Sequence, residues 1–223
     1  MNLLGFDTST AAVSACVLRG DGRHFELAPG PEALGERPAH SRELMPVVAA
    51  VLDESGLDWE DLDAIAVGVG PGSFTGLRIG VSSARALGAA GRIPLRPVSS
   101  LAALGEGIEG QPRLPLIDAK RGELFAALYE RGATRWPPFA SPPEGIAERV
   151  CNEGIRPVAA GEGSIRFREL LEAAGIRIEP EGSNTHVVRG LHVCRLAAAA
   201  PDRAPQGVLP EYLRTPDTGP GQP

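Results

Sequence analysis

The 223-residue sequence has few aromatic residues, few cysteines and hardly any lysine. Aromatic residues make up 4% of it, so its core must be built mainly from leucine, valine, isoleucine and alanine, and Lys120 is the one lysine among 22 basic residues. The three cysteines are far apart and form no Cys-x-x-Cys pair, so the sequence indicates neither a zinc site nor a disulfide framework. Such cysteine usage fits a protein from a reducing, cytoplasmic compartment.

The sequence also has no apolar run as long as a membrane span, and its first residues lack the basic and apolar segments of a signal peptide. We therefore expect a cytoplasmic location and no membrane partner. The formal net charge is −6. An acidic chain is poorly suited to hold nucleic acid by itself, because binding to phosphates requires a basic surface.

Two parts of the sequence have the same pattern, which indicates an internal duplication. Residues 3–7 and 114–118 are apolar, strand-like segments that end in Asp7 and Asp118, and each is followed by a short loop and a second strand. Further strands then alternate with helical segments, which we expect at 44–52, from the glycine-rich segment at 70–80 to about Gly91, over a short stretch at 101–104, and at 165–174 and 191–199. The pattern predicts two α/β lobes of βββαβα order, the architecture of the actin-like ATPase and sugar-kinase fold.

The expected division of the chain follows its composition. We assign residues 1–105 to an N-terminal lobe with docking helices, 106–214 to a smaller C-terminal lobe and 215–223 to a disordered tail of proline, glycine and polar residues. The proline-rich segment 136–143 is predicted to be a loop. Ser41 is the expected N-cap of the helix over 44–52.

A glycine-dense segment at residues 70–80, GPGSFTGLRIG, joins a predicted strand at 64–69 to a helix that ends near Gly91. Backbone N–H groups at such a helix start favour an anion. The segment lacks the Gly-Lys-Ser/Thr of a Walker A loop, so a contribution to a shared site is favoured over an independent ATPase site. Seven residues could form the nucleotide or anion site: Asp7, Thr8, Gly70, Gly72, Ser73, Thr75 and Arg78.

Small residues recur every four positions in the helix after this loop, at Gly76, Gly80, Ala84 and Gly88. They line one helix face, and the lack of bulk there lets another backbone come close. Two alternatives stay open at this point. The face could pack inside its own lobe, or it could dock a helix of another chain.

Six motifs occur in the order in which a known family has them. They are Asp7-Thr8-Ser9, His40-Ser41-x-x-Leu44-x-Pro46, GPGSFTGLRIG at 70–80, Ser99-Ser100-Leu101, IDAKRGE at 117–123, and Pro210-x-Tyr212-Leu213-Arg214. Together they resemble the TsaB family of bacterial threonylcarbamoyladenosine biosynthesis subunits over nearly the whole chain. The motif at 70–80 is highly specific, and the others are individually weak.

The resemblance implies an actin-like fold and a non-catalytic scaffold or activating subunit. It implies a heterodimer with the paralogue TsaD, recruitment of the ATPase TsaE, and a homodimer. The complex transfers a threonylcarbamoyl group to the adenosine 3′ of the anticodon in tRNAs that read ANN codons. ATP and a metal ion would be used by the partner subunits, this chain would have no cofactor or catalytic residue of its own, and tRNA would be met through the complex.

The resemblance also favours the docking alternative for the small-residue face, because TsaB pairs with TsaD and with itself through its first two helices. The implied interface residues lie on the two predicted helices that flank the strand at 64–69: Ser41, Leu44, Val48, Gly76, Ile79, Gly80, Ser83, Ala84 and Leu87.

His40 is a poor metal ligand in this sequence. In TsaD the matching helix has two histidines four residues apart that can bind a metal, whereas here Leu44 follows His40 at that spacing. Since a metal site needs three or four ligands, we expect no metal site in this chain, and a metallopeptidase is disfavoured.

The alternative to a scaffold subunit is an enzyme, a free-standing small-molecule kinase or ATPase of the same fold. Asp7 and Asp118 could face a cleft, but a role in capping the following turn is favoured.

Overall fold

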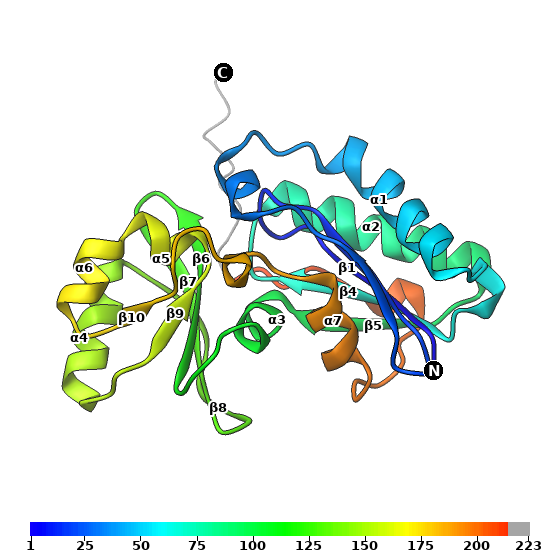
Figure 1. The fold of residues 1–223 in the computed structure, drawn as a ribbon. Helices are drawn as coiled ribbons and strands as arrows, with labels where there is room; N and C mark the ends of the chain where they lie inside the picture. The colour runs from blue at the N-terminus through cyan, green and yellow to red at the C-terminus, as the bar shows by residue number, and fades with distance from the viewer. Residues whose placement is uncertain (214–223) are drawn as a thin grey trace, which may run out of the picture.

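A computed structural model describes residues 1–213. They form two five-stranded mixed sheets with helices on their faces (Figure 1). The first sheet has the order β3-β2-β1-β4-β5, and its strands are β1 (Leu3–Asp7), β2 (Ser14–Leu18), β3 (His24–Leu27), β4 (Ala64–Gly70) and β5 (Leu95–Ser99). The second has the order β10-β9-β6-β7-β8, and its strands are β6 (Arg113–Lys120), β7 (Glu123–Glu130), β8 (Ala133–Ser141), β9 (Val158–Ala160) and β10 (Arg177–Ile178).

The two sheets repeat one topology. In the first, β1 pairs antiparallel with β2 and parallel with β4, and β5 follows parallel to β4. In the second, β6 pairs in the same way with β7 and β9, and β10 follows parallel to β9. The predicted fold class is thereby confirmed: two lobes of matching strand order make the actin-like fold.

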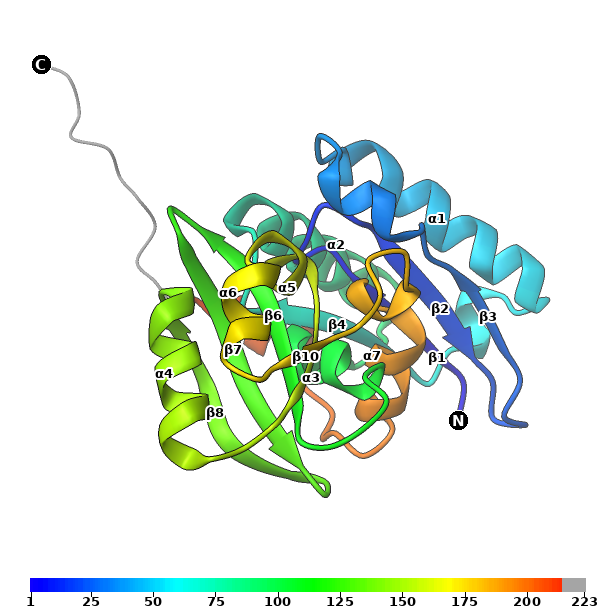
Figure 2. The same ribbon diagram turned by 60° about the vertical axis from the view of Figure 1, so that its left-hand side comes forward.

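The helices divide the hydrophobic core into layers. Helices α1 (His40–Ser55) and α2 (Phe74–Gly91) cover one face of the first sheet, and α3 (Ser100–Glu106) and α7 (Gly190–Ala197) cover the other (Figure 2). Helices α4 (Pro143–Glu153) and α6 (Arg168–Ala173) pack on the outer face of the second sheet, and α5 (Glu162–Arg166) precedes α6. Since α3 shares a core with strands of both sheets, it joins the lobes.

The chain returns to the first lobe after β10, which differs from the expected boundary. Helix α7 packs against β1 and β2, where a Cβ on Gly190 would lie 2.7 Å from the Ala15 backbone. Buried residues of α7 belong to the same core as Leu3 and Cys16. The second sheet ends at Ile178, so only part of the range 106–214 lies with it. The predicted tail, 215–223, lies outside the described residues.

Three local predictions were wrong. The segment 136–143 is not a loop: β8 continues to Ser141, and its prolines are tolerated because β8 is an edge strand that pairs only with β7 in the described sheet. The helix expected at 165–174 is two short helices that meet at Phe167. Ser41 lies inside α1 rather than at its N-cap, which is Ala39 and has no side-chain cap.

Candidate functional site

A cleft of about 400 Å³ lies between the two lobes. From the first lobe it is bordered by the turn after β1, by residues 34–38 and by the glycine loop before α2. From the second lobe it is bordered by the β6–β7 turn and the start of α5, and the chain segment 211–213 completes it. The duplication therefore places the ends of β1 and β6 at one shared opening.

The glycine loop is held against the turn after β1. The Ser73 backbone N–H donates to the Ser9 carbonyl at 2.7 Å, and the Ser73 hydroxyl caps α2 by accepting from the Gly76 N–H at 3.3 Å. A Cβ on Gly72 would lie 2.4 Å from the Ser9 carbonyl oxygen, so the backbones approach too closely for a side chain. The predicted strand–loop–helix arrangement at 64–91 is confirmed.

Asp7 is buried beneath the cleft and does not border it. Its carboxylate accepts hydrogen bonds from the Ser9 N–H (2.7 Å), the Ser9 hydroxyl (2.6 Å) and the Ser100 hydroxyl (2.6 Å). Burial raises the pKa of Asp7, and the hydrogen bonds from Ser100 and Ser9 oppose that rise. Ser100 also accepts from the Gly70 N–H at 3.2 Å, so Asp7 links β1, β4 and α3. The turn-capping alternative for Asp7 is confirmed.

Asp118 occupies the matching position in the second lobe. Its Oδ1 accepts from the Lys120 N–H at 2.8 Å, and its Oδ2 accepts from the Lys120 ammonium at 3.1 Å and from Arg166 at 2.8 Å. Burial acts to raise the pKa of Asp118, but the bonds from Lys120 and Arg166 outweigh it and the pKa is lowered. Asp118 therefore caps its turn as Asp7 does, and it also borders the cleft.

The seven residues predicted to form a nucleotide or anion site are not gathered in one place. Gly72, Ser73 and Thr75 border the cleft, and their anion-binding role stays a prediction. Asp7, Thr8 and Gly70 are buried within the first lobe, where the Thr8 hydroxyl donates to the Gly76 carbonyl at 2.8 Å. Arg78 is exposed, and its guanidinium lies 4.5 Å from the Phe74 ring centre.

Sequence reasoning missed a carboxylate in the cleft, Glu162. It follows Gly161 directly after β9, and since β9 runs parallel to β6, both strands deliver residues to the same sheet edge. The Asp118 N–H donates to the Glu162 carboxylate, and burial raises the pKa of Glu162 to about 7. Only the pairing of β9 with β6 brings Glu162 to the cleft, and the sequence pattern does not predict that pairing.

Acidic residues outnumber basic ones among the residues that border the cleft. Glu36, Asp118, Glu162 and Glu211 border it, and Lys120, the one basic residue there, is paired with Asp118. The helix start at Ser73 favours an anion, so an anion-binding role of the glycine loop stays a prediction. Residues 1–213 also contain no group of three or more metal-ligating side chains.

The small-residue face of α2 turns inward, as in the internal-packing alternative. A Cβ on Gly76 would lie 2.0 Å from the Thr8 carbonyl oxygen, and one on Gly80 would lie 2.3 Å from the Thr8 hydroxyl. Gly76, Gly80 and Ala84 are buried with no partner chain present, which corrects the expectation that they form an open docking face. Two further interface candidates, Leu44 and Val48, are buried in the core.

Four other interface candidates remain accessible. Ser41 is exposed, and Ile79, Ser83 and Leu87 are half-buried on the outward side of α2. Their contact with a partner stays a prediction.

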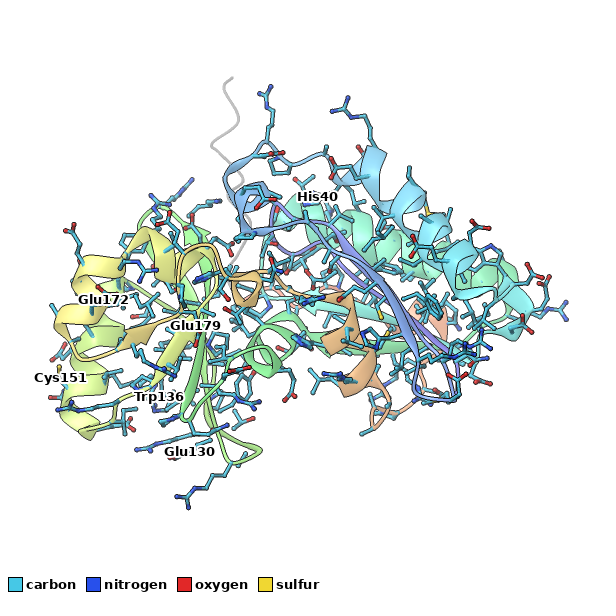
Figure 3. The ribbon with its side chains drawn as sticks, viewed as in Figure 1. His40, Glu130, Trp136, Cys151, Glu172 and Glu179 are labelled. Carbon is cyan, nitrogen blue, oxygen red and sulfur yellow. The ribbon has the colours of Figure 1, made fainter. Side chains whose placement is uncertain are left out.

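His40 opens α1 and is used within the first lobe. Its side chain is buried, and its Nε2 donates to the Thr10 carbonyl at 2.6 Å. Figure 3 places it in the layer of α1 and α2, and a Cβ on Gly76 would lie 3.1 Å from its ring. His40 thus fixes the β1–β2 turn against α1.

Across residues 1–213, no helix is both long and apolar enough to span a membrane.

Comparisons with known proteins agree with the motifs. Residues 35–144 match the family model described as "TsaD: tRNA N6-adenosine threonylcarbamoyltransferase". The tRNA threonylcarbamoyladenosine biosynthesis protein TsaB of Escherichia coli is 38% identical over 138 residues, 59% of this chain and 56% of that protein. TsaB of Haemophilus influenzae is 33% identical over 160 residues, 68% of this chain and 64% of that protein. The chain spans less than two thirds of the length of these relatives.

Solved structures agree with the fold. YeaZ from Pseudomonas aeruginosa is 27% identical with a TM-score of 0.76, over 95% of this chain and 100% of that one. The ethanolamine utilization protein EutJ from Carboxydothermus hydrogenoformans is 13% identical with a TM-score of 0.53, over 86% of this chain and 89% of that one, and supports the fold alone. The chain is therefore a homologue of the TsaB proteins with the actin-like fold, as its motifs predicted.

Proposed function

We propose that this chain takes part in tRNA threonylcarbamoyladenosine biosynthesis as a non-catalytic scaffold or activating subunit. The observation that carries the proposal is its similarity to proteins named TsaB in three bacteria, at 33–38% identity. The TsaD-type match over residues 35–144 supports a common origin with the transferase subunit. A protein that is a paralogue of an enzyme and pairs with it can stabilise the active form of that enzyme without chemistry of its own.

The proposed partner is a TsaD-type protein, which would dock on the outward side of α1 and α2. Ser41, Ile79, Ser83 and Leu87 are the predicted interface residues that remain accessible. Met45, on the same side of α1, is an exposed large hydrophobic residue at 41% exposure, which a docking partner would cover. A homodimer would use the same helices and would therefore compete with the heterodimer.

The transfer chemistry is proposed to lie with the partners. The TsaD-type subunit would hold the metal ion, the TsaE-type ATPase would join the pair and use ATP, and tRNA would be bound by the complex. Two features of this chain support that division. The His40 Nε2 is hydrogen-bonded to the Thr10 carbonyl, and the residue four positions after it is a buried leucine, Leu44, and not a second histidine.

The interface part of the proposal is tested with variants at accessible positions. Ser83→Arg and Ser41→Arg place a long charged side chain on the docking face without filling the core. Light scattering and calorimetry with the cognate TsaD-type protein should find the heterodimer with the wild type and at least tenfold weaker binding with Ser83→Arg. The matched control is Glu148→Arg on the exposed side of α4 in the other lobe. Equal binding by all four proteins would contradict this interface.

A further inference from the structure

Acidic and basic residues are unevenly distributed along this acidic chain. The sequence has 28 acidic residues, yet none lies between Asp63 and Glu106, a stretch that contains α2 and four arginines. We propose that a row of arginines along α2 binds the phosphate backbone of an RNA strand, with an unpaired base stacked at one end of the row. The proposal rests on the proposed function, because the RNA it names is the tRNA that the complex would modify.

The arginine row consists of Arg78 and Arg85 on α2 and Arg92 directly after it. Two turns of an α-helix take about seven residues, so these side chains leave the helix on one side, about 10 Å apart along its axis. Arg78 and Arg92 are exposed, Arg85 is half-buried, and none of the three is in an ion pair within residues 1–213. Two exposed residues between them, Ser82 and Ala89, are small, so a strand can lie along the row.

The row lies on the side of α2 that faces away from α1. A Cβ on Gly76 would lie 3.1 Å from the ring of His40 on α1, and Arg78 is about 200° further round the helix. On the other flank of α2, a Cβ on Gly88 would lie 3.2 Å from Pro205, where the segment 203–213 passes along the helix (Figure 1). The predicted docking residues of α2 are about a quarter turn or more from the row. A protein partner and an RNA strand would therefore use different sides of this helix.

One end of the row borders a hollow of about 410 Å³ between α2 and residues 202–206. Arg92 and Arg203 border this hollow, and neither is in an ion pair within the described part of the chain. Asp202, the one acidic residue on the border, pairs with Arg96 at 2.7 Å. The charge of Asp202 is thereby balanced, which leaves two arginines for an anion. A guanidinium has several N–H donors in a planar fork that matches the oxygens of a phosphate group.

Two exposed aromatic rings lie at the other end of the row. Phe74 is one helical turn before Arg78, and its ring centre is 5.1 Å from that of Tyr212. Phe74 is 36% exposed and Tyr212 is 41% exposed. The Arg78 guanidinium lies 4.5 Å from the Phe74 ring centre, so a cation stands beside the rings. Arginines that hold phosphates next to rings that stack on unpaired bases are the usual combination in proteins that bind single-stranded nucleic acid.

The overall net charge of −6 sets the expected strength of binding, not its place. Exposed charges more than about 8 Å apart are largely screened at physiological salt, so the local arginines decide what approaches α2. Each phosphate contact to a single strand contributes about −0.7 to the slope of log affinity against log salt concentration, so four arginines give about −3. We expect modest, salt-dependent binding by this chain, to which the partner subunits of the complex would add.

The test is fluorescence anisotropy of a labelled anticodon stem–loop from an ANN-reading tRNA, titrated with the whole chain at about 50 mM salt and above. The wild type should bind saturably with the salt slope given above. A row variant with Arg78→Gln, Arg85→Gln and Arg92→Gln should bind at least about tenfold more weakly, with a slope shallower by about 2. The matched control loses the same charge at exposed arginines outside the row and should bind as the wild type does: Arg131→Gln, Arg156→Gln and Arg195→Gln.

A second variant tests the stacked base. Phe74→Leu keeps an apolar side chain but removes the ring. It should weaken binding of the stem–loop, which has unpaired bases, about tenfold. Binding of a fully paired RNA duplex, which offers no unpaired base to stack, should not change.

Three results would overturn the proposal. The first is no saturable binding of the stem–loop by the folded wild type. The second is equal binding by the row variant and its matched control, with circular dichroism confirming that both are folded. The third is weaker binding of the row variant to the cognate TsaD-type protein with unchanged RNA binding, which would assign the row to a protein interface. tRNA modification that still requires a chain unable to bind RNA would refute this inference and leave the scaffold role standing.

Discussion

Replacement of Gly76 by alanine tests the inward packing of α2 most sharply. The new Cβ would lie 2.0 Å from the Thr8 carbonyl oxygen, whereas real Cβ contacts essentially never fall under 3.0 Å. The helix and the turn after β1 would therefore have to separate by about 1 Å. The atom in the way is backbone, so no side-chain rotation relieves the contact.

The expected cost follows from opposing contributions. Overpacking of a tight core costs about 1–3 kcal/mol or more. Separation also weakens the buried hydrogen bond from the Thr8 hydroxyl to the Gly76 carbonyl, which contributes about 1 kcal/mol. Alanine recovers about 1 kcal/mol of helix propensity. We expect Gly76→Ala to lower the free energy of unfolding by about 1–3 kcal/mol, or a few degrees in Tm for each kcal/mol.

Urea unfolding followed by circular dichroism measures this change. A Cβ at Gly80 would lie 2.3 Å from the Thr8 hydroxyl, a side-chain atom and not backbone, so Gly80→Ala should cost less than Gly76→Ala. Ser82→Ala, exposed in the same helix, is the control and should be neutral or slightly stabilising. If Gly76→Ala is as stable as the wild type, the small-residue face does not pack on the turn after β1.

Two further predictions concern buried carboxylates. The pKa of Glu162 is about 7 in the folded chain and about 4.5 when unfolded, so ionisation of this group destabilises the folded wild type as the pH rises from 4.5 through 7. Glu162→Gln should be as stable as the wild type below pH 4.5 and more stable by about 1–3 kcal/mol at pH 8, as measured by urea unfolding at both pH values. Equal stability of the two proteins at pH 8 would contradict the burial of this charge. The Glu26 carboxylate accepts hydrogen bonds from the Leu191 N–H at 2.9 Å and from Arg189, and so links β3 to the start of α7. Glu26→Ala should therefore lower the free energy of unfolding by about 1–3 kcal/mol. An unchanged urea denaturation midpoint would show that these hydrogen bonds do not stabilise the fold.

Much of the fold could be predicted because local signals and the tertiary structure agree. The apolar run before Asp7 is a strand, and the glycine loop ends where Ser73 caps α2. The turn-capping role of Asp7 followed from its place after a strand. These features depend on residues close together in the sequence, and that is where sequence patterns are informative.

The features that could not be predicted depend on residues far apart in the sequence. A row of small residues indicates a close approach, but it does not say that the approaching backbone is at Thr8, 68 positions before Gly76. The prolines of β8 indicate a loop unless the strand is known to be at a sheet edge. Glu162 becomes a cleft residue only when β9 is known to lie beside β6.

Reconstituted tRNA threonylcarbamoylation tests the central claim most directly. The cognate TsaD-type and TsaE-type proteins, the threonylcarbamoyl donor and an ANN-reading tRNA would be combined with and without this chain, and the chain would also be assayed alone. The account predicts modification only when the chain and its partners are present together, and none from the chain by itself. Full modification without the chain, or modification by the chain alone, would contradict a non-catalytic activating subunit.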